Sequence, residues 1–234
     1  MNFNPASRSK LTAHDHGRFT GDALFARIAR VVCDAECLPR KELYEAWEVA
    51  RRARRKFRGG RVLDLACGHA LVAHLMLLLD DSSPMALAVD TRLPSSAAKL
   101  SQHLVRRWPR LAGRVHLVES SIDAVKGEAG DVIVSCHACG DLTDQVLQTA
   151  MQASARVVVL PCCHAKSKAA EGGLGGWLDS ALAIDVTRVA TLQSRGYLVY
   201  TQQIPSAVTP KNRLLLAEPA RDEAIAARSA TDSA

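Results

Sequence analysis

The chain has 234 residues, of which 48% are hydrophobic and 23% charged, and its net charge is +6. These values are close to those of globular proteins and exclude a disordered chain or a fibrous repeat. The longest nearly apolar stretch, residues 70–79, is about half the length that a membrane-spanning helix needs. The N-terminus carries no secretion signal, and seven cysteines, an odd number, do not fit a complete disulfide framework. We therefore expect a reduced, cytoplasmic protein that does not bind membranes.

Two helices are predicted before residue 60. Thr20-Gly21-Asp22 offers capping residues for a first helix, whose apolar positions run from Leu24 to Val32. Pro39 opens a second helix, which Gly59-Gly60 ends. We therefore divide the chain into an N-terminal helical extension at 1–58, a main domain at 59–219 and a mobile C-terminal tail at 220–234.

From Arg61 onward, short apolar runs alternate with helical stretches. The predicted strands are residues 62–66, 85–90, 115–118, 131–136, 156–161, 197–204 and 213–217. The predicted helices between them are residues 70–80, 94–108, 141–153 and 177–194. Alternation of this kind builds a mostly parallel sheet, because the connecting helices supply the crossovers that parallel strands require.

The last two predicted strands break the alternation. Only residues 205–212 separate them, which is too short for a crossover helix, so the two strands should pair antiparallel at the sheet edge. The predicted fold class is therefore α/β: a Rossmann-like, seven-stranded, mostly parallel sheet with an antiparallel last strand and helices on both faces.

Small and acidic residues follow the first two predicted strands. Asp64-Leu65-Ala66-Cys67-Gly68-His69-Ala70 forms a tight turn before a helix, where the backbone can approach a ligand closely. The GxGxxG phosphate cradle of dinucleotide-binding proteins is absent. Asp90 follows the second strand, where a carboxylate can accept hydrogen bonds from ribose hydroxyls. In this order and spacing, these features fit an adenosyl ligand with a compact, carboxylate-bearing tail.

The loop at residues 64–69 and two later motifs carry a family resemblance. Residues 62–217 resemble a class I S-adenosylmethionine (SAM)-dependent methyltransferase. Residues 64–69 (DLACGH), 136–144 (CHACGDLTD) and 161–164 (PCCH) are similar to a methyltransferase family that includes eukaryotic tRNA acceptor-stem ribose 2′-O-methylases. Other branches of that family have no settled substrate. Two departures stand out: Ala70 replaces a usual glycine, and the zinc modules of the tRNA enzymes are missing.

The resemblance implies a set of cofactor-binding residues for SAM. The methionine end would be bordered by Asp64, Ala66, Gly68 and His69. The ribose would be held by Asp90 and Thr91, and the adenine would meet Ser121 and Ile122. His137, after the fourth strand, would lie nearest the sulfonium methyl group.

Methyl transfer to a hydroxyl group needs alignment of the two reactants and removal of one proton. His137, Asp141 and His164 are the proton acceptors predicted at the edge of the sheet where the cofactor binds. We expect His137 to be the catalytic base, although a partly buried histidine that bonds to the backbone would show the same sequence pattern.

Cysteine and histidine residues follow two neighbouring predicted strands: Cys136 and Cys139 after one, then Cys162, Cys163 and His164 after the next. Together they could bind zinc with tetrahedral geometry. A vicinal pair, however, lacks the usual ligand spacing, and strand-end cysteines often serve as small apolar side chains. A third reading makes Cys162 or Cys163 a nucleophile toward a pyrimidine ring. We expect a site without a metal ion.

Positive charges gather in two places. The first arginine cluster comprises Arg51, Arg52, Arg54, Arg55, Lys56, Arg58 and Arg61, and the second comprises Arg106, Arg107, Arg110 and Arg114. Such clusters are typical of phosphate binding but also of solvated helix faces.

These charges favour RNA as a partner and the ribose 2′-oxygen as the methylated atom. Two alternatives stay open: methylation of a protein or a small molecule, and a binding module without catalysis. The first alternative is favoured if the first arginine cluster lies on the face of the protein opposite Gly68.

Overall fold

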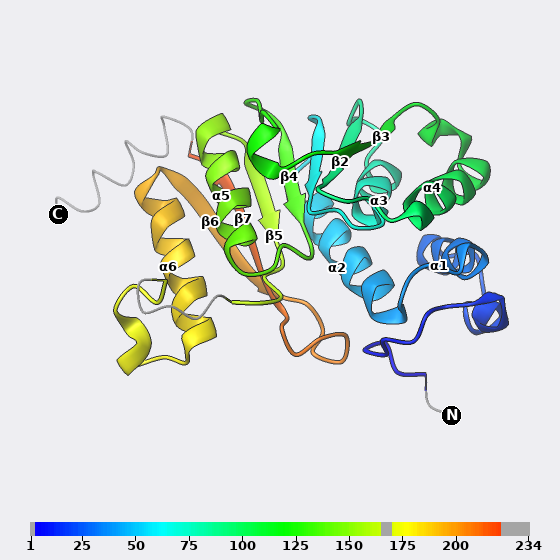
Figure 1. Ribbon diagram of the computed structural model, residues 1–234, viewed down its shortest axis with the longest axis horizontal. Coiled ribbons are helices and arrows are strands. Elements are labelled where there is room, and N and C mark those ends of the chain that lie inside the picture. The colour runs from blue at the N-terminus through cyan, green and yellow to red at the C-terminus, as the bar shows by residue number, and fades with distance from the viewer. Residues whose placement is uncertain (1–2, 165–169, 221–234) are drawn as a thin grey trace.

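The computed structural model describes residues 3–164 and 170–220. Its strands form one seven-stranded sheet in the order β3-β2-β1-β4-β5-β7-β6 (Figure 1). The strands are β1 (Val62–Leu65), β2 (Ala86–Asp90), β3 (Val115–Glu119), β4 (Val132–Ser135), β5 (Arg156–Val159), β6 (Tyr197–Gln203) and β7 (Arg213–Pro219). The first five run parallel, whereas β7 pairs antiparallel with both β5 and β6. This confirms the predicted sheet and its edge hairpin. Of the tail predicted at 220–234, residues 221–234 lie outside the described residues.

Helices cover both faces of this sheet (Figure 1). The α-helices are α1 (Leu24–Ala35), α2 (Arg40–Lys56), α3 (Leu71–Leu79), α4 (Ser95–Arg107), α5 (Asp141–Ala153) and α6 (Ser180–Ser194). Short 3-10 helices occupy Ala13–Arg18, Pro109–Leu111, Ile122–Ala124 and Leu174–Gly176. Within the described ranges, no helix has both the length and the apolar surface needed to span a bilayer.

The alternation of strand side chains explains the two layers. Val132 and Val134 of β4 belong to a core shared with α1 to α4, whereas Ile133 belongs to a second core with α5 and α6. Successive strand residues point to opposite faces, so a strand that is apolar at every position is buried on both sides. The burial of all four β4 residues therefore follows from the continuous apolar run in the sequence.

The N-terminal helices are part of the main core. Leu43 of α2 and Phe57 after it are buried in the same cluster as Val62 of β1, across the predicted boundary at 58/59. The first helix begins later than its predicted cap: Ala23 is the N-cap residue, and it makes no side-chain capping bond. The described part of this segment, residues 3–58, therefore contributes directly to the core around the sheet.

Much of the first arginine cluster is tied into the fold. Arg54 is only 2% exposed; its guanidinium donates to the Met76 carbonyl and the Ser83 hydroxyl and lies 3.3 Å from the Asp80 carboxylate. Arg61 pairs with Asp131 at 2.8 Å. Arg54 and Arg61 are thus paired with carboxylates of this chain, and these pairs stabilise the fold.

Part of the positive charge lies at the amino edge of the parallel strands. Arg61 directly precedes β1. In the second cluster, Arg114 donates to the Ser83 carbonyl and Arg110 pairs with Asp81, both in the segment before β2. Gly68 follows β1 at the opposite, carboxyl edge. Arg61 and the second cluster therefore lie far from the predicted cofactor loop, whereas Arg52 donates to the Gln203 carbonyl at the end of β6.

Candidate active site

The loop after β1 has an unusual backbone. Ala66, Gly68 and Ala70 all have positive φ values, of 57°, 53° and 60°. The left-handed conformation costs a non-glycine residue roughly 1–2 kcal/mol, so the surrounding structure must hold the two alanines in place. One such contact is visible: the Gly68 amide donates to Asp90 Oδ2 at 2.9 Å. Ala70 thus adopts the same turn conformation that a glycine would allow, and the predicted loop forms despite this substitution.

A cavity of about 270 Å³, the cofactor pocket, opens beside this loop. Its wall comprises Leu38, Glu42, Ala46, Asp64, Ala66, Cys67, Gly68, His69, Leu71, Val72, Cys136 and His137. A Cβ atom added at Gly68 would meet no atom within 4 Å, so it would project into open space. The glycine therefore leaves room for a ligand against the backbone, and all four residues predicted for the methionine end line this pocket.

The residues predicted for the ribose and the adenine lie beyond this pocket on the same edge of the sheet. Asp90 ends β2, and its carbonyl accepts a hydrogen bond from the Ser120 amide after β3 at 2.9 Å. Thr91 and Ser121 therefore belong to adjoining segments. The Ile122 side chain is buried in the second core, so little of its surface is accessible to a ligand.

A second cavity of about 370 Å³, the adjoining pocket, shares a wall with the first. It is lined by Arg8, Pro39, Lys41, Glu42, Glu45, His137, Cys162, Cys163, Thr209, Pro210 and Lys211. His137 and Glu42 line both cavities. The two cavities therefore lie side by side, with His137 and Glu42 between them.

His137 has the properties of a proton acceptor. Burial lowers the pKa of its imidazole below the ordinary value of 6.5, so the ring is neutral at neutral pH. Within residues 3–164 and 170–220, its ring nitrogens have no hydrogen-bond partner. One ring nitrogen of a neutral imidazole accepts a proton, so this histidine is free to take one from a substrate.

The other two predicted acceptors lie elsewhere. His164 Nε2 bonds to Asp185 Oδ1 at 2.8 Å, within a buried network that also contains Arg188 and Arg213. Asp141 is the exposed first residue of α5. Neither residue lines either pocket. The structure thus brings His137, but not Asp141 or His164, to the junction of the two cavities.

Two acidic residues of α2 at this junction were missed by sequence reasoning. Glu42 lies 3.9 Å from His69 Nδ1, and Glu45 is 1% exposed. Glu45 Oε1 accepts from Lys41 Nζ at 2.5 Å, whereas its buried Oε2 has no partner among the described residues. A buried oxygen without a donor is costly, so a bound ligand that donates a hydrogen bond would stabilise it. Neither carboxylate was among the predicted site residues, because the second predicted helix was assigned to the N-terminal extension.

Comparisons with known proteins identify the family and the fold of this chain. The profile of a family described as "Methyltransferase domain" matches residues 41–170. The chain belongs to this methyltransferase family. Its fold is that of the class I SAM-dependent methyltransferases, and membership indicates SAM as the cofactor. A search of curated protein sequences found no significant match.

Solved structures show the same fold at low sequence identity. An O-methyltransferase family protein from Burkholderia thailandensis is 15% identical, with a TM-score of 0.53 over 89% of this chain. The pyocyanin biosynthetic protein PhzM is 18% identical, with a TM-score of 0.51 over 90% of this chain. The tRNA methyltransferase TrmK of B. subtilis is 14% identical, with a TM-score of 0.48 over 74% of this chain. The present chain spans 63%, 62% and 66% of the length of these proteins, respectively.

Replacing Asp90 with alanine should weaken SAM binding by roughly tenfold to a hundredfold. The variant would remove the hydrogen bonds that Asp90 is predicted to accept from the ribose hydroxyls, each worth about 1.5–3 kcal/mol when one partner is charged. It also removes the acceptor of the Gly68 amide. Calorimetric titration measures the effect. Asp123→Ala, which removes an exposed carboxylate from the neighbouring 3-10 helix, is the matched control. An unchanged dissociation constant in folded Asp90→Ala would exclude Asp90 from the site.

Two buried groups beside the loop give opposite pH dependences. Burial raises the pKa of the Asp64 carboxyl to about 7 and lowers the pKa of the His74 imidazole to about 4. The unfolded values are near 3.8 and 6.5. Folded Asp64 therefore binds more protons than unfolded Asp64 between about pH 4 and 7, so its contribution to the free energy of unfolding falls as pH rises. His74 binds fewer protons when folded, so its contribution rises between about pH 4 and 6.5.

In the wild-type protein the two slopes oppose each other. Asp64→Asn removes the Asp64 slope, so between pH 4 and 6.5 the free energy of unfolding should rise more steeply than in the wild type, with a difference of at most about 1.4 kcal/mol per pH unit. In His74→Gln the slope should be lower than in the wild type over the same range. Urea unfolding at pH 4, 5, 6 and 7 measures both variants. Identical slopes in the two variants would show that neither group titrates as described.

Proposed function

We propose that this chain transfers a methyl group from SAM to a hydroxyl oxygen of a compact anionic substrate in the adjoining pocket. The shared wall at His137 carries the proposal, because it joins the cavity beside Gly68 to a second cavity of substrate size. SAM in the cofactor pocket would supply the electrophilic methyl group. Asp64, Gly68 and His69 would hold its methionine end, and Asp90 its ribose.

The chain's own residues would contribute alignment and proton removal. A substrate confined beside the cofactor loop reacts as part of one complex, which avoids most of the entropy cost of bringing two molecules together. His137 would accept the hydroxyl proton, because its ring is neutral and faces both cavities. Glu45 Oε2 would accept a second hydrogen bond from the substrate and so fix its position.

The charges at the adjoining pocket support an anionic substrate. Arg8 and Lys211 are exposed at its wall, and neither forms an ion pair with a described carboxylate. Lys41, by contrast, is already neutralised by Glu45. Two free cations beside a cavity attract a carboxylate or a phosphate group and raise its local concentration.

A small molecule is the first candidate for this substrate. Of the charges that favoured RNA, Arg61 and the second cluster lie at the far edge of the sheet, and Arg54 and Arg61 are paired with Asp80 and Asp131. The volume of the adjoining pocket also fits a compact group. Methylation of an RNA ribose 2′-oxygen is the second candidate, because a backbone phosphate would meet Arg8 and Lys211 in the same way.

Incubation with methyl-labelled SAM and separated metabolite, RNA and protein fractions tests the proposal. We expect label in an anionic metabolite, and Arg8→Glu combined with Lys211→Glu should raise the KM for it. Arg106→Glu, an exposed change at the far edge of the sheet, is the control. Label in RNA that is lost in the same double variant would favour the second candidate. Label in protein, or none in any fraction, would contradict both.

A further inference from the structure

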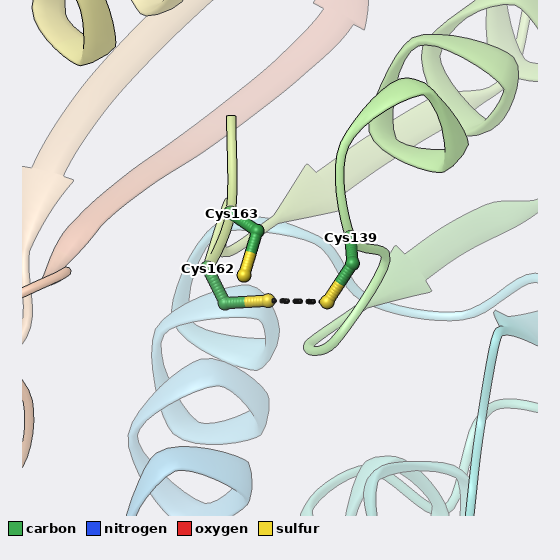
Figure 2. A group of neighbouring side chains, drawn as sticks. All are labelled: Cys139, Cys162 and Cys163. Carbon is green, nitrogen blue, oxygen red and sulfur yellow. Dashed lines mark hydrogen bonds between the residues drawn. The ribbon is translucent and has the colours of Figure 1, made fainter. Parts of the chain in front are cut away.

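Three cysteine thiols converge at the adjoining pocket. The Sγ atoms of Cys139, Cys162 and Cys163 all lie within 4.8 Å of one another, and those of Cys139 and Cys162 are 3.1 Å apart. Figure 2 shows the three side chains pointing toward one another from two loops, one after β4 and the other after β5. The parallel pairing of these strands places the loops side by side at the carboxyl edge.

The two loops are held together independently of the thiols. The Gly140 amide donates to the Cys163 carbonyl at 3.1 Å, directly beside the cluster. Arg188 then anchors the β4 loop, because its guanidinium bonds to the Gly140 carbonyl and to Asp144. Asp185 anchors the other loop through His164. The convergence of the thiols is therefore built into the fold and does not depend on contacts between the sulfur atoms.

Neither simpler role for these cysteines accounts for the arrangement. Cys139 is exposed, so it does not act as a small apolar core residue, as the buried Cys33 and Cys37 do. A disulfide would use two of the three thiols and leave the third beside it. Three sulfur atoms on one centre match the ligand preference of zinc, whose bonds of about 2.3 Å in tetrahedral geometry place sulfurs about 3.8 Å apart.

We propose that Cys139, Cys162 and Cys163 bind one Zn²⁺ ion. This differs in two respects from the sequence analysis, which expected no metal and weighed Cys136 and His164 as ligands. Cys136 is buried in the wall of the cofactor pocket, and His164 is bonded to Asp185. Binding converts the thiols to thiolates, and the displaced protons pass to solvent.

The fourth position of this zinc site faces the adjoining pocket, because Cys162 and Cys163 both line that cavity. Three protein ligands with one open position are the arrangement of zinc sites that bind water or substrate, whereas purely structural sites are closed by a fourth side chain. Lys211 Nζ lies 3.9 Å from Cys163 Sγ and donates a hydrogen bond to the ligand sulfur, as groups around zinc ligands commonly do.

Metal titration of the purified, reduced and chelator-stripped protein tests this site without any assay of methyl transfer. We expect one Zn²⁺ per chain by elemental analysis after desalting. With Co²⁺ as the probe, we expect the charge-transfer absorption of cobalt–thiolate bonds. Cys139→Ser and Cys163→Ser should each weaken Zn²⁺ binding by at least about a hundredfold, because each removes a thiolate ligand.

Cys136→Ala is the matched control, since it removes a neighbouring thiol that lies outside the cluster. It should retain one Zn²⁺ per chain. Circular dichroism of each variant separates loss of metal from loss of fold. No saturable Zn²⁺ binding by folded, reduced wild-type protein would overturn the proposal, as would binding that disappears in Cys136→Ala but survives in Cys139→Ser. Recovery of a Cys139–Cys162 disulfide with no metal would also overturn it. Because the readout is metal content, these results are independent of whether the chain methylates any substrate.

Discussion

His137→Ala should lower turnover by about 10²-fold or more while leaving the affinity for SAM nearly unchanged. The imidazole is neutral, without a partner among the described residues, and lies in the wall that joins the two cavities. Loss of a positioned general base typically costs 10²- to 10⁴-fold in rate. Steady-state kinetics and calorimetric SAM titration measure the two quantities separately.

The pH dependence of turnover distinguishes a base from a merely structural histidine. Because burial lowers the pKa of His137, wild-type turnover should be level around neutral pH and fall only below the ordinary value of 6.5. That acidic limb should disappear in His137→Ala. Turnover that survives the substitution with its acidic limb intact would show that another group removes the proton.

Arg54→Met should lower the free energy of unfolding by about 3–5 kcal/mol. The side chain is 2% exposed, and the substitution leaves the buried Asp80 carboxylate without its nearest cation and the Ser83 hydroxyl and Met76 carbonyl without a donor. Removal of one partner from a buried ion pair typically has this cost. Urea unfolding measures it.

Arg55→Met is the matched control for this prediction. Arg55 is the next residue of α2 but is exposed, so its substitution should change the free energy of unfolding by less than about 0.5 kcal/mol. Equal and small effects at both positions would show that the buried pair contributes little. The contrast would also show that adjacent arginines of one charge run have different roles.

The sheet and the helices that follow Arg61 were predictable because each rests on local signals. The apolar run of β4 and the short connection between β6 and β7 specify a buried strand and an antiparallel hairpin without information from distant residues. The cofactor loop was predictable for the same reason: Gly68 and Asp90 follow strand ends, and parallel strands bring those ends together.

The remaining features of the site depend on contacts between distant residues. The burial of Arg54 depends on Asp80, 26 positions away, and on Ser83, so a charge run in the sequence did not separate it from the exposed Arg55. Glu45 reaches the site because α2 packs against the sheet. His164 turns toward Asp185 rather than the pocket, since Arg188 and Arg213 anchor that carboxylate. None of these pairings leaves a periodic signal in the sequence.

Calorimetric titration of SAM into the wild-type protein tests the central claim most directly. The cofactor pocket beside Gly68 predicts a saturable isotherm with one SAM per chain, displaced by S-adenosylhomocysteine. Gly68→Val places a β-branched residue at a left-handed φ of 53° and its side chain in the open space beside the loop, so it should abolish the isotherm; circular dichroism checks that the variant is folded. Wild-type protein that shows no saturable heat, or a Gly68→Val variant that binds SAM as tightly as the wild type, would contradict the account.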